Sequence, residues 1–192
     1  MIAAAVTRGD VTIHNLIPKH MEPLTVKMLE MGFNIDQGDD WIRVSIDDDV
    51  ELEPTNFKTR PYPGFPTDLQ PQATVLLCQA HGLSRMHENV WDNRFQYIPE
   101  LQSMGASITV MERIALVNGP VQFCGAKVAA LDLRAGAAMV LAGLAADGVT
   151  TIKCANRIER GYEKIVEKLR AVGAEIDHVP DDEDHVVSDG DE

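Results

Sequence analysis

An internal repeat is the feature of this 192-residue sequence that most limits its fold. Three segments can be laid over one another: "AAAVTRGDVTIHNLIPKHMEPLTVKMLEMGFNID", "LLCQAHGLSRMHENVWDNRFQYIPELQSMGASIT" and "VLAGLAADGVTTIKCANRIERGYEKIVEKLRAVGAEID". Each runs from an apolar helix end through a glycine and a short strand to an amphipathic helix, a second glycine and a further strand. Glycine is favoured just past a helix end, where the backbone needs a positive φ. A spacing of roughly 70 residues is long for a solenoid, so the pattern predicts three copies of one α/β unit in a single domain.

The second and third units show their elements in full. The second is predicted to contain a strand at 57–61, a helix from Thr67 to Ala80, a strand at 83–90, a helix from Phe95 to Met104, and a hairpin of strands at 107–112 and 114–119. The third repeats this order with a strand at 126–131, a helix from Asp132 to Ala146, a strand at 150–155, a helix from Tyr162 to Val172 and a strand at 174–179.

The first unit is shorter than the other two. Met1 falls inside its first helix, so we expect either a truncated chain or an opening strand supplied from elsewhere. The sequence thus predicts one α/β domain over residues 1–180, built from β-α-β-α-β-β units at about 1–55, 56–119 and 120–180, the first incomplete. Residues 181–192 are strongly acidic and are predicted to form a disordered tail.

The helices of each unit fall into two kinds. "ATVLLCQA" and "AGAAMVLAGLAA" are apolar nearly all round, which predicts burial. By contrast, "YEKIVEKLRAVG" places Ile165, Leu169 and Val172 on one face and is predicted to cover a surface. One set of helices should therefore be enclosed and the other set more exposed.

Charge and cysteine usage limit the partners and the compartment. A formal net charge of -13 argues against nonspecific binding to nucleic acid or to anionic membranes. The most apolar stretch, "AAMVLAGLAA", is too short to span a bilayer. The cysteines Cys78, Cys124 and Cys154 have no CxxC spacing, so we expect reduced thiols in a cytoplasmic protein, with Cys78 and Cys154 buried in apolar runs.

The stretch "RPYPGFPTDLQPQ" places Asp68 at a predicted helix start. Thr67 is a good N-cap and Gln70 follows three residues later, which predicts a capping box. Aspartate is common in first turns for structural reasons alone, because the helix dipole favours its anion. The stiff, proline-rich approach also suits a carboxylate held in one place, and Asp132 occupies the matching position in the third unit.

Arginines recur at the other helix starts. Arg94 aligns with Arg160, the first unit has Lys19-His20 nearby, and Arg134 follows Asp132. A lone arginine is usually a solvated surface charge, but helix starts and guanidinium groups both suit phosphate and carboxylate. From pattern alone we infer a cleft for a small polyanion, with the three arginines near it and Asp68 as a candidate base.

Four motifs carry a resemblance to a known family. "YPGFPTDLQPQ", "VWDNRF", "LDLRAGAAMVLAGLAADG" and "IERGYEKIVEKLRAVGAEI" closely resemble the bacterial UDP-N-acetylglucosamine enolpyruvyl transferases (1-carboxyvinyltransferases), in order across nearly the whole chain. The sister family that acts on shikimate 3-phosphate shares the fold, but "GFPTDLQPQ" and "DLRAGAA" resemble the UDP-sugar branch.

The resemblance implies a fold of two similar domains, each an inside-out α/β barrel of three units. It implies transfer of enolpyruvyl from phosphoenolpyruvate to the 3-hydroxyl of UDP-N-acetylglucosamine in peptidoglycan precursor synthesis, with no cofactor and no metal. By motif, Asp68 resembles the general base, Asp132 the aspartate that helps place the reacting groups, and Val90 a backbone contact to the UDP-sugar. Arg94, Arg134 and Arg160 resemble the cations around phosphoenolpyruvate.

Only about half of the family's length is present. The family's lysine-asparagine pair, its mobile loop with a reactive cysteine and most uridine contacts have no match here. We therefore expect the C-terminal part of a transferase, inactive without the N-terminal domain of the same enzyme. The alternative is a stand-alone binding or interaction module, which could self-associate through an open sheet edge.

Overall fold

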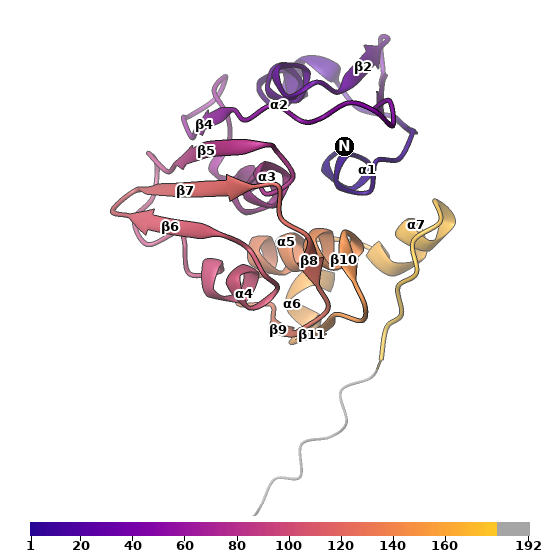
Figure 1. Ribbon diagram of the computed structural model, residues 1–192. Helices are drawn as coiled ribbons and strands as arrows, with labels where there is room; N and C mark the ends of the chain where they lie inside the picture. The colour runs from indigo at the N-terminus through magenta and orange to yellow at the C-terminus, as the bar shows by residue number, and fades with distance from the viewer. Residues whose placement is uncertain (180–192) are drawn as a thin grey trace, which may run out of the picture.

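Three buried helices form the centre of the computed structural model, which describes residues 1–179 (Figure 1). They are α1 (Ile2–Val6), α3 (Gln70–Leu77) and α5 (Leu133–Leu144), and each contacts the other two. Every residue of α3 is buried, as are Ala135–Val140 and Ala142 of α5. The predicted burial of these two apolar helices is confirmed.

The second unit contains a mixed four-stranded sheet in the order β4-β5-β7-β6. Its elements are β4 (Asn56–Lys58), α3, β5 (Gly82–His87), α4 (Ile98–Ser103), β6 (Ile108–Met111) and β7 (Ile114–Gly119). β4 runs parallel to β5, whereas β5–β7 and β6–β7 are antiparallel, so the predicted hairpin is confirmed. Met86 on β5 and Val117 on β7 are fully buried, and both strands contact α3.

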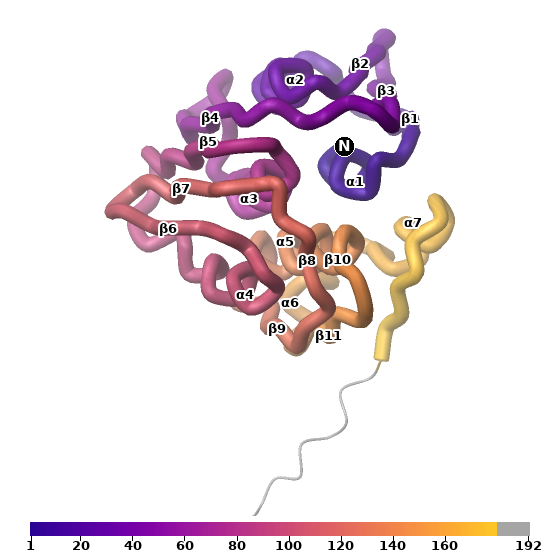
Figure 2. The backbone as a smooth tube through the Cα atoms, viewed as in Figure 1, coloured from indigo at the N-terminus to yellow at the C-terminus, as the bar shows by residue number. Residues whose placement is uncertain are grey.

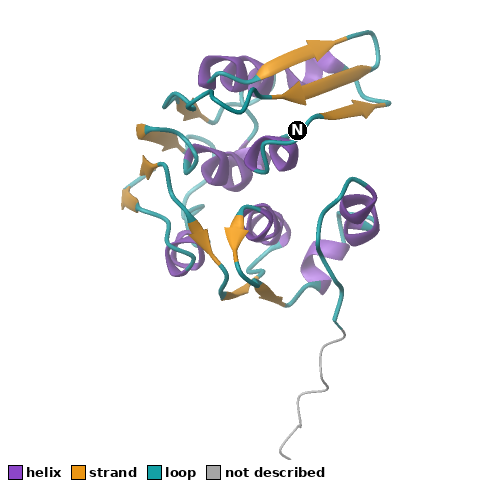
Figure 3. Cartoon of the chain, turned by 45° about the vertical axis from the view of Figure 1, so that its right-hand side comes forward, coloured by secondary structure: helices purple, strands orange, loops and turns teal. Residues whose placement is uncertain are grey.

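The first unit adds an antiparallel sheet in the order β1-β3-β2. In Figure 3 this sheet lies at the upper right, close to the N-terminus. Its elements after α1 are β1 (Val11–His14), α2 (Pro18–Met31), β2 (Asn34–Gln37) and β3 (Trp41–Ser45). The side chains of Ile42 and Val44 on β3 are fully buried, which gives this sheet one face toward the core.

The third unit is made of short parallel pairs. Its elements are β8 (Phe123–Cys124), β9 (Lys127–Ala129), α5, β10 (Ala146–Asp147), β11 (Thr151–Lys153), α6 (Asn156–Glu159) and α7 (Ile165–Ala171). β8 pairs with β10 and β9 with β11. Figure 2 shows the chain passing from the first unit through the second into this one.

The predicted strand at 174–179 is wrong. The segment instead folds back on α7: Ala174 N–H donates to the Leu169 carbonyl at 3.0 Å, and Arg170 contacts the Ile176 carbonyl and the Asp177 carboxylate. A strand needs a neighbour whose amide and carbonyl groups face it, and none of residues 1–179 pairs with this segment. Helix α6 was not predicted either.

The glycines that end the amphipathic helices share one backbone conformation. Gly32, Gly105 and Gly173 have φ values of 103°, 101° and 99°. This left-handed conformation explains why the sequence repeats glycine at these positions. The predicted helix ends are confirmed at all three.

Other predictions about exposure have mixed outcomes. Cys78 is buried as predicted, but Cys154 is exposed because it lies in a left-handed turn (φ 59°) after β11. Ile165 and Leu169 pack on a small cluster around Ile158, whereas Val172 is 61% exposed, beyond the end of α7. The predicted acidic tail lies outside the described residues. No helix among residues 1–179 is long and apolar enough to cross a bilayer.

Candidate active site

Asp68 and Arg134 meet at the starts of α3 and α5, two of the three central helices. Asp68 lies in the short 3₁₀ helix η1 (Thr67–Leu69), directly before α3, and Arg134 is the second residue of α5. Because α3 packs along α5, the Asp68 carboxylate reaches the Arg134 guanidinium and pairs with its Nε. The hydrogen bond to Asp68 raises the pKa of Arg134 above its already high value. The structure thus brings together two of the residues that the sequence analysis singled out at helix starts.

The predicted capping box at Thr67 and Gln70 is wrong. The Thr67 hydroxyl donates to Glu88 Oε2 at 2.8 Å, and neither η1 nor α3 has a side-chain cap. The buried Gln70 amide has no hydrogen-bond partner among the described residues. The Thr67 hydroxyl therefore hydrogen-bonds the buried carboxylate of Glu88 and does not cap the helix.

Asp132 caps α5. Its Oδ1 accepts hydrogen bonds from the backbone N–H groups of Arg134 (2.7 Å) and Ala135 (2.8 Å). Arg157 also holds the segment that leads into α5, because its guanidinium donates to the Ala130 and Leu131 carbonyls at 3.1 and 2.7 Å. The position of Arg134 is thus set by its own backbone as well as by Asp68.

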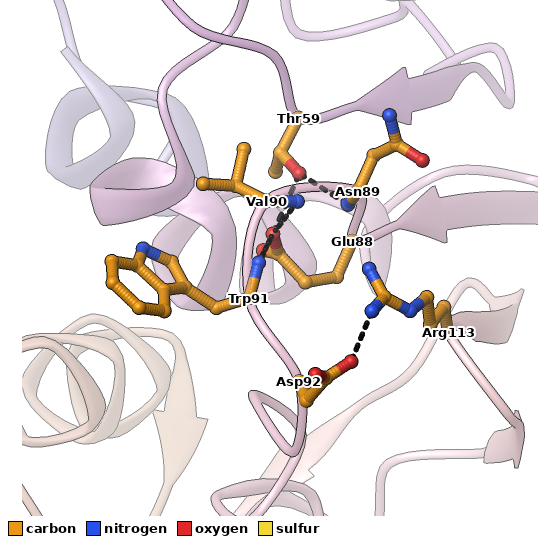
Figure 4. Close-up of polar contacts among 7 residues, drawn as sticks. All are labelled: Thr59, Glu88, Asn89, Val90, Trp91, Asp92 and Arg113. Carbon is orange, nitrogen blue, oxygen red and sulfur yellow. Dashed lines mark hydrogen bonds and ion pairs between the residues drawn. The ribbon is translucent and has the colours of Figure 1, made fainter.

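Glu88, which sequence reasoning missed, is the most connected side chain of the site (Figure 4). It is 1% exposed. Its Oε1 accepts from Thr59 Oγ1 (2.8 Å), Val90 N–H (2.8 Å) and Trp91 N–H (3.1 Å), and its Oε2 accepts from Thr67. The available signal was an acidic residue inside the strand predicted at 83–90, since a carboxylate that is buried in a strand requires partners.

The loop after β5 carries two further predicted residues, Val90 and Arg94. Val90 lies at its start with its N–H bound by Glu88. The Arg94 guanidinium lies 5.8 Å from the centre of the Trp91 ring, within range of a cation–π contact. On the other side, Asp92 pairs with Arg113 in the turn between β6 and β7 (Figure 4). The first part of the loop is therefore held by Glu88 on one side and by Arg113 on the other.

Arg160 is an exposed residue directly after α6, and its side chain makes no ion pair among residues 1–179. Its neighbours tie it to the site. The next residue, Gly161, packs so closely on Leu133 that a Cβ there would lie 2.7 Å from Leu133 Cδ2. Tyr162 OH is 3.1 Å from Gln72 Nε2 on α3. The segment with Arg160 thus lies against the starts of α3 and α5.

No group of three or more His, Cys, Asp or Glu side chains within residues 1–179 is placed to hold a metal ion. The candidate site consists instead of one exposed carboxylate, arginines, and backbone groups ordered by a buried carboxylate. Such a set can bind an anion of several charges and accept a proton beside it.

Comparison with known proteins gives consistent matches. The family model for EPSP synthase (3-phosphoshikimate 1-carboxyvinyltransferase) matches residues 1–169. UDP-N-acetylglucosamine 1-carboxyvinyltransferase 2 of Clostridium acetobutylicum is 47% identical over 176 residues, or 92% of this chain and 42% of the relative. UDP-N-acetylglucosamine 1-carboxyvinyltransferase of Halothermothrix orenii is 49% identical with the same coverage. The chain therefore spans less than half the length of these relatives.

Solved structures extend the comparison. The enolpyruvyl transferase NikO from Streptomyces tendae superposes with a TM-score of 0.83 at 28% identity, over 93% of this chain and 43% of NikO. EPSP synthase from Acinetobacter baumannii superposes with a TM-score of 0.69 over 93% of this chain and 45% of that chain, and at 19% identity it supports the fold alone. The α/β class predicted from the repeat is confirmed, and the chain belongs to the EPSP synthase (3-phosphoshikimate 1-carboxyvinyltransferase) family of enolpyruvyl transferases.

Proposed function

We propose that a protein containing this chain transfers enolpyruvyl from phosphoenolpyruvate to the 3-hydroxyl of UDP-N-acetylglucosamine and releases phosphate. The observation that carries this proposal is the contact between Asp68 and Arg134, which puts a proton acceptor beside a cation at two helix starts. The names of relatives at 47–49% identity support UDP-N-acetylglucosamine as the acceptor. The product would enter peptidoglycan synthesis in the cytoplasm and so serve cell-wall growth, cell shape and division.

The fold proposed for this chain is one inside-out α/β barrel, with α1, α3 and α5 inside and the sheets outside. Support comes from the mutual packing of these three helices and from the close superposition on NikO. Since the matched relatives are more than twice as long as the matched region, we propose that a second domain of the same protein completes the site. Both substrates would bind between the two domains.

The residues have distinct roles in the proposed reaction. Asp68 takes the proton of the 3-hydroxyl as the hydroxyl oxygen bonds to C2 of phosphoenolpyruvate, and C3 gains a proton from solvent. Elimination then breaks the bond from C2 to the phosphate oxygen, returns a proton from C3 to solvent, restores the double bond and releases phosphate. Arg94, Arg134 and Arg160 stabilise the carboxylate and phosphate charges during both steps.

The pairing of Asp68 with Arg134 links donor binding to the base. An incoming phosphate or carboxylate group competes for the Arg134 guanidinium, which binds such groups in forked geometry. Loss of this partner leaves the Asp68 carboxylate free for the acceptor hydroxyl. Asp132 keeps Arg134 in place meanwhile through its bond to the Arg134 backbone.

Phosphate release and product mass test the proposal directly. The protein that contains this chain is incubated with phosphoenolpyruvate and either UDP-N-acetylglucosamine or shikimate 3-phosphate. Turnover with the UDP-sugar supports the proposal, and turnover only with shikimate 3-phosphate, the substrate class of the family description, replaces it with the sister reaction. Turnover with neither acceptor rejects it and favours a binding module, for which a dimer in native mass measurement would support pairing through open sheet edges.

A further inference from the structure

Glu88 is a buried acid held without a cationic partner. Its side chain makes no ion pair with any Lys, Arg or His of residues 1–179, and the residue is 1% exposed. Burying a carboxylate is costly unless donors replace its water. Four donors do so here, two hydroxyls and two backbone N–H groups, which fill both carboxylate oxygens.

These donors come from segments that carry site residues. Thr67 directly precedes Asp68. Val90 and Trp91 begin the loop that leads to Arg94. Thr59, at the end of β4, also accepts a 2.7 Å hydrogen bond from Asn89 N–H, so three successive amides point toward Glu88 and Thr59. A single carboxylate thus joins the Asp68 turn to the loop after β5.

These contacts also leave the carbonyl oxygen of Val90, and not its N–H group, available to hydrogen-bond a ligand. Its N–H is used by Glu88, whereas none of residues 1–179 donates a hydrogen bond to its carbonyl. A ligand that meets the Val90 backbone therefore meets an acceptor. The hydroxyl and amide N–H groups of an N-acetyl sugar are suitable donors.

We propose that Glu88 is a positioning residue, which sets the Asp68 carboxylate and the Val90 carbonyl at a fixed separation for the acceptor sugar. This rests on the proposed function. Glu88 is buried and acts through the two segments it binds. A small displacement of a base from its substrate costs rate without loss of folding, so Glu88 affects turnover beyond its effect on stability.

The test separates positioning from stability with two Thr→Val variants, one in η1 and one in the adjoining helix α3. Thr67→Val removes the bond to Glu88. Thr74→Val is the matched control, because its buried hydroxyl bonds Tyr97 OH at 2.8 Å and has no contact with Glu88. We expect Thr67→Val to lower kcat by about 10- to 100-fold with the KM for phosphoenolpyruvate unchanged. Thr74→Val should lose stability but keep kcat.

Glu88→Gln extends the test. Its oxygen can still accept from Val90 and Trp91, but its NH₂ group then faces Thr67 and the hydroxyl must turn to accept. We expect kcat to fall as in Thr67→Val, with the KM for the acceptor sugar little changed. Equal kcat losses in Thr67→Val and Thr74→Val, or an unchanged kcat in folded Thr67→Val, would overturn the proposal.

Amide hydrogen exchange tests the coupling through Glu88 without any substrate. Thr67→Val should speed exchange at Val90 and Trp91, while Thr74→Val should leave both rates unchanged, if Glu88 couples the two segments. Unchanged rates in Thr67→Val refute the coupling even in an active enzyme. Altered rates in a protein without turnover on UDP-N-acetylglucosamine refute the proposed function and leave the coupling in place.

Discussion

The carboxylate of Asp68 is paired with the guanidinium of Arg134, 66 residues further along the chain. The two residues belong to different copies of the repeat, and each lies at the start of a central helix. The contact therefore depends on how α3 and α5 pack, and no local pattern specifies it.

Replacing Asp68 by Asn in the complete protein should reduce kcat by about 10²- to 10⁴-fold, the usual contribution of a general base. Folding should be little affected, because the Asp68 side chain is 60% exposed and exposed ion pairs add little stability. Steady-state kinetics and urea denaturation measure the two effects. Asp10→Asn, which breaks an exposed pair with Arg43, is the control that should retain kcat. Near-normal turnover in Asp68→Asn would remove Asp68 from the mechanism.

A methyl group at Gly136 should destabilise the protein although alanine is the better helix former. A Cβ there would lie 2.5 Å from Ile158 Cγ1 and 3.0 Å from Ala130 Cβ, so α6 would have to move. We expect Gly136→Ala to lower the free energy of unfolding by about 1–3 kcal/mol, as for an overpacked core. Gly143→Ala on the same helix meets Thr150 only at 3.3 Å and should be near neutral. Urea denaturation compares the two, and equal losses would contradict the predicted clash.

Acid should weaken the first unit through Asp10. Two hydrogen bonds from Arg43, at 2.6 and 2.7 Å, lower the pKa of Asp10 below its ordinary value of 3.8. A carboxyl whose pKa is lowered by folding stabilises the protein above its unfolded pKa, and this contribution is lost as the pH falls through and below 3.8.

Asp10→Asn should therefore be less stable than the parent at neutral pH, and the difference should shrink in acid. Denaturation at several pH values measures it. Asp36→Asn changes the same charge on the same sheet, 3.9 Å from Arg43, and should show a smaller difference. If the difference in the free energy of unfolding between the parent and Asp10→Asn grew as the pH fell, the predicted role of Asp10 would be contradicted.

Thiol labelling should distinguish Cys78 from the other cysteines. Burial raises the pKa of the Cys78 thiol to about 12, and the side chain is inaccessible in the folded protein. Because the thiolate is the reactive form, Cys124 and Cys154, both exposed, should react with a thiol reagent at about pH 8. Mass spectrometry should find two labels on the native chain and three after denaturation. A native chain with three labels would show that the Cys78 region opens readily.

The parts of the fold that follow from apolar pattern and glycine position were predictable. The buried helices α3 and α5, the hairpin of β6 and β7, and the left-handed glycines each depend on residues close in sequence. The capping box failed because Thr67 bonds Glu88, 21 residues away. The strand at 174–179 failed because pairing depends on a neighbour, which apolar alternation does not supply.

The site was predictable only where motifs named it. Asp68, Arg134 and Asp132 stand at helix starts, a place that sequence can locate. Glu88 has no periodic signal, since its four donors come from three separate segments. That Arg94 and Arg160 line the same binding site as Asp68 stays a prediction. For Arg160 it is supported by the packing of the next residue, Gly161, on Leu133.

The packing of α3 on α5 is the largest helix–helix contact among residues 1–179, and Asp68 and Arg134 sit at the ends of those two rods. The alignment of the proposed reacting groups therefore depends on the interior of the fold, where small side chains such as Ala73 of α3 and Ala138 of α5 are fully buried. A larger side chain at either position would have to displace its neighbours. The turnover of the complete protein would then depend on the volume of its interior side chains. A variant enlarged at one of these positions would fold and bind both substrates but would have lost turnover.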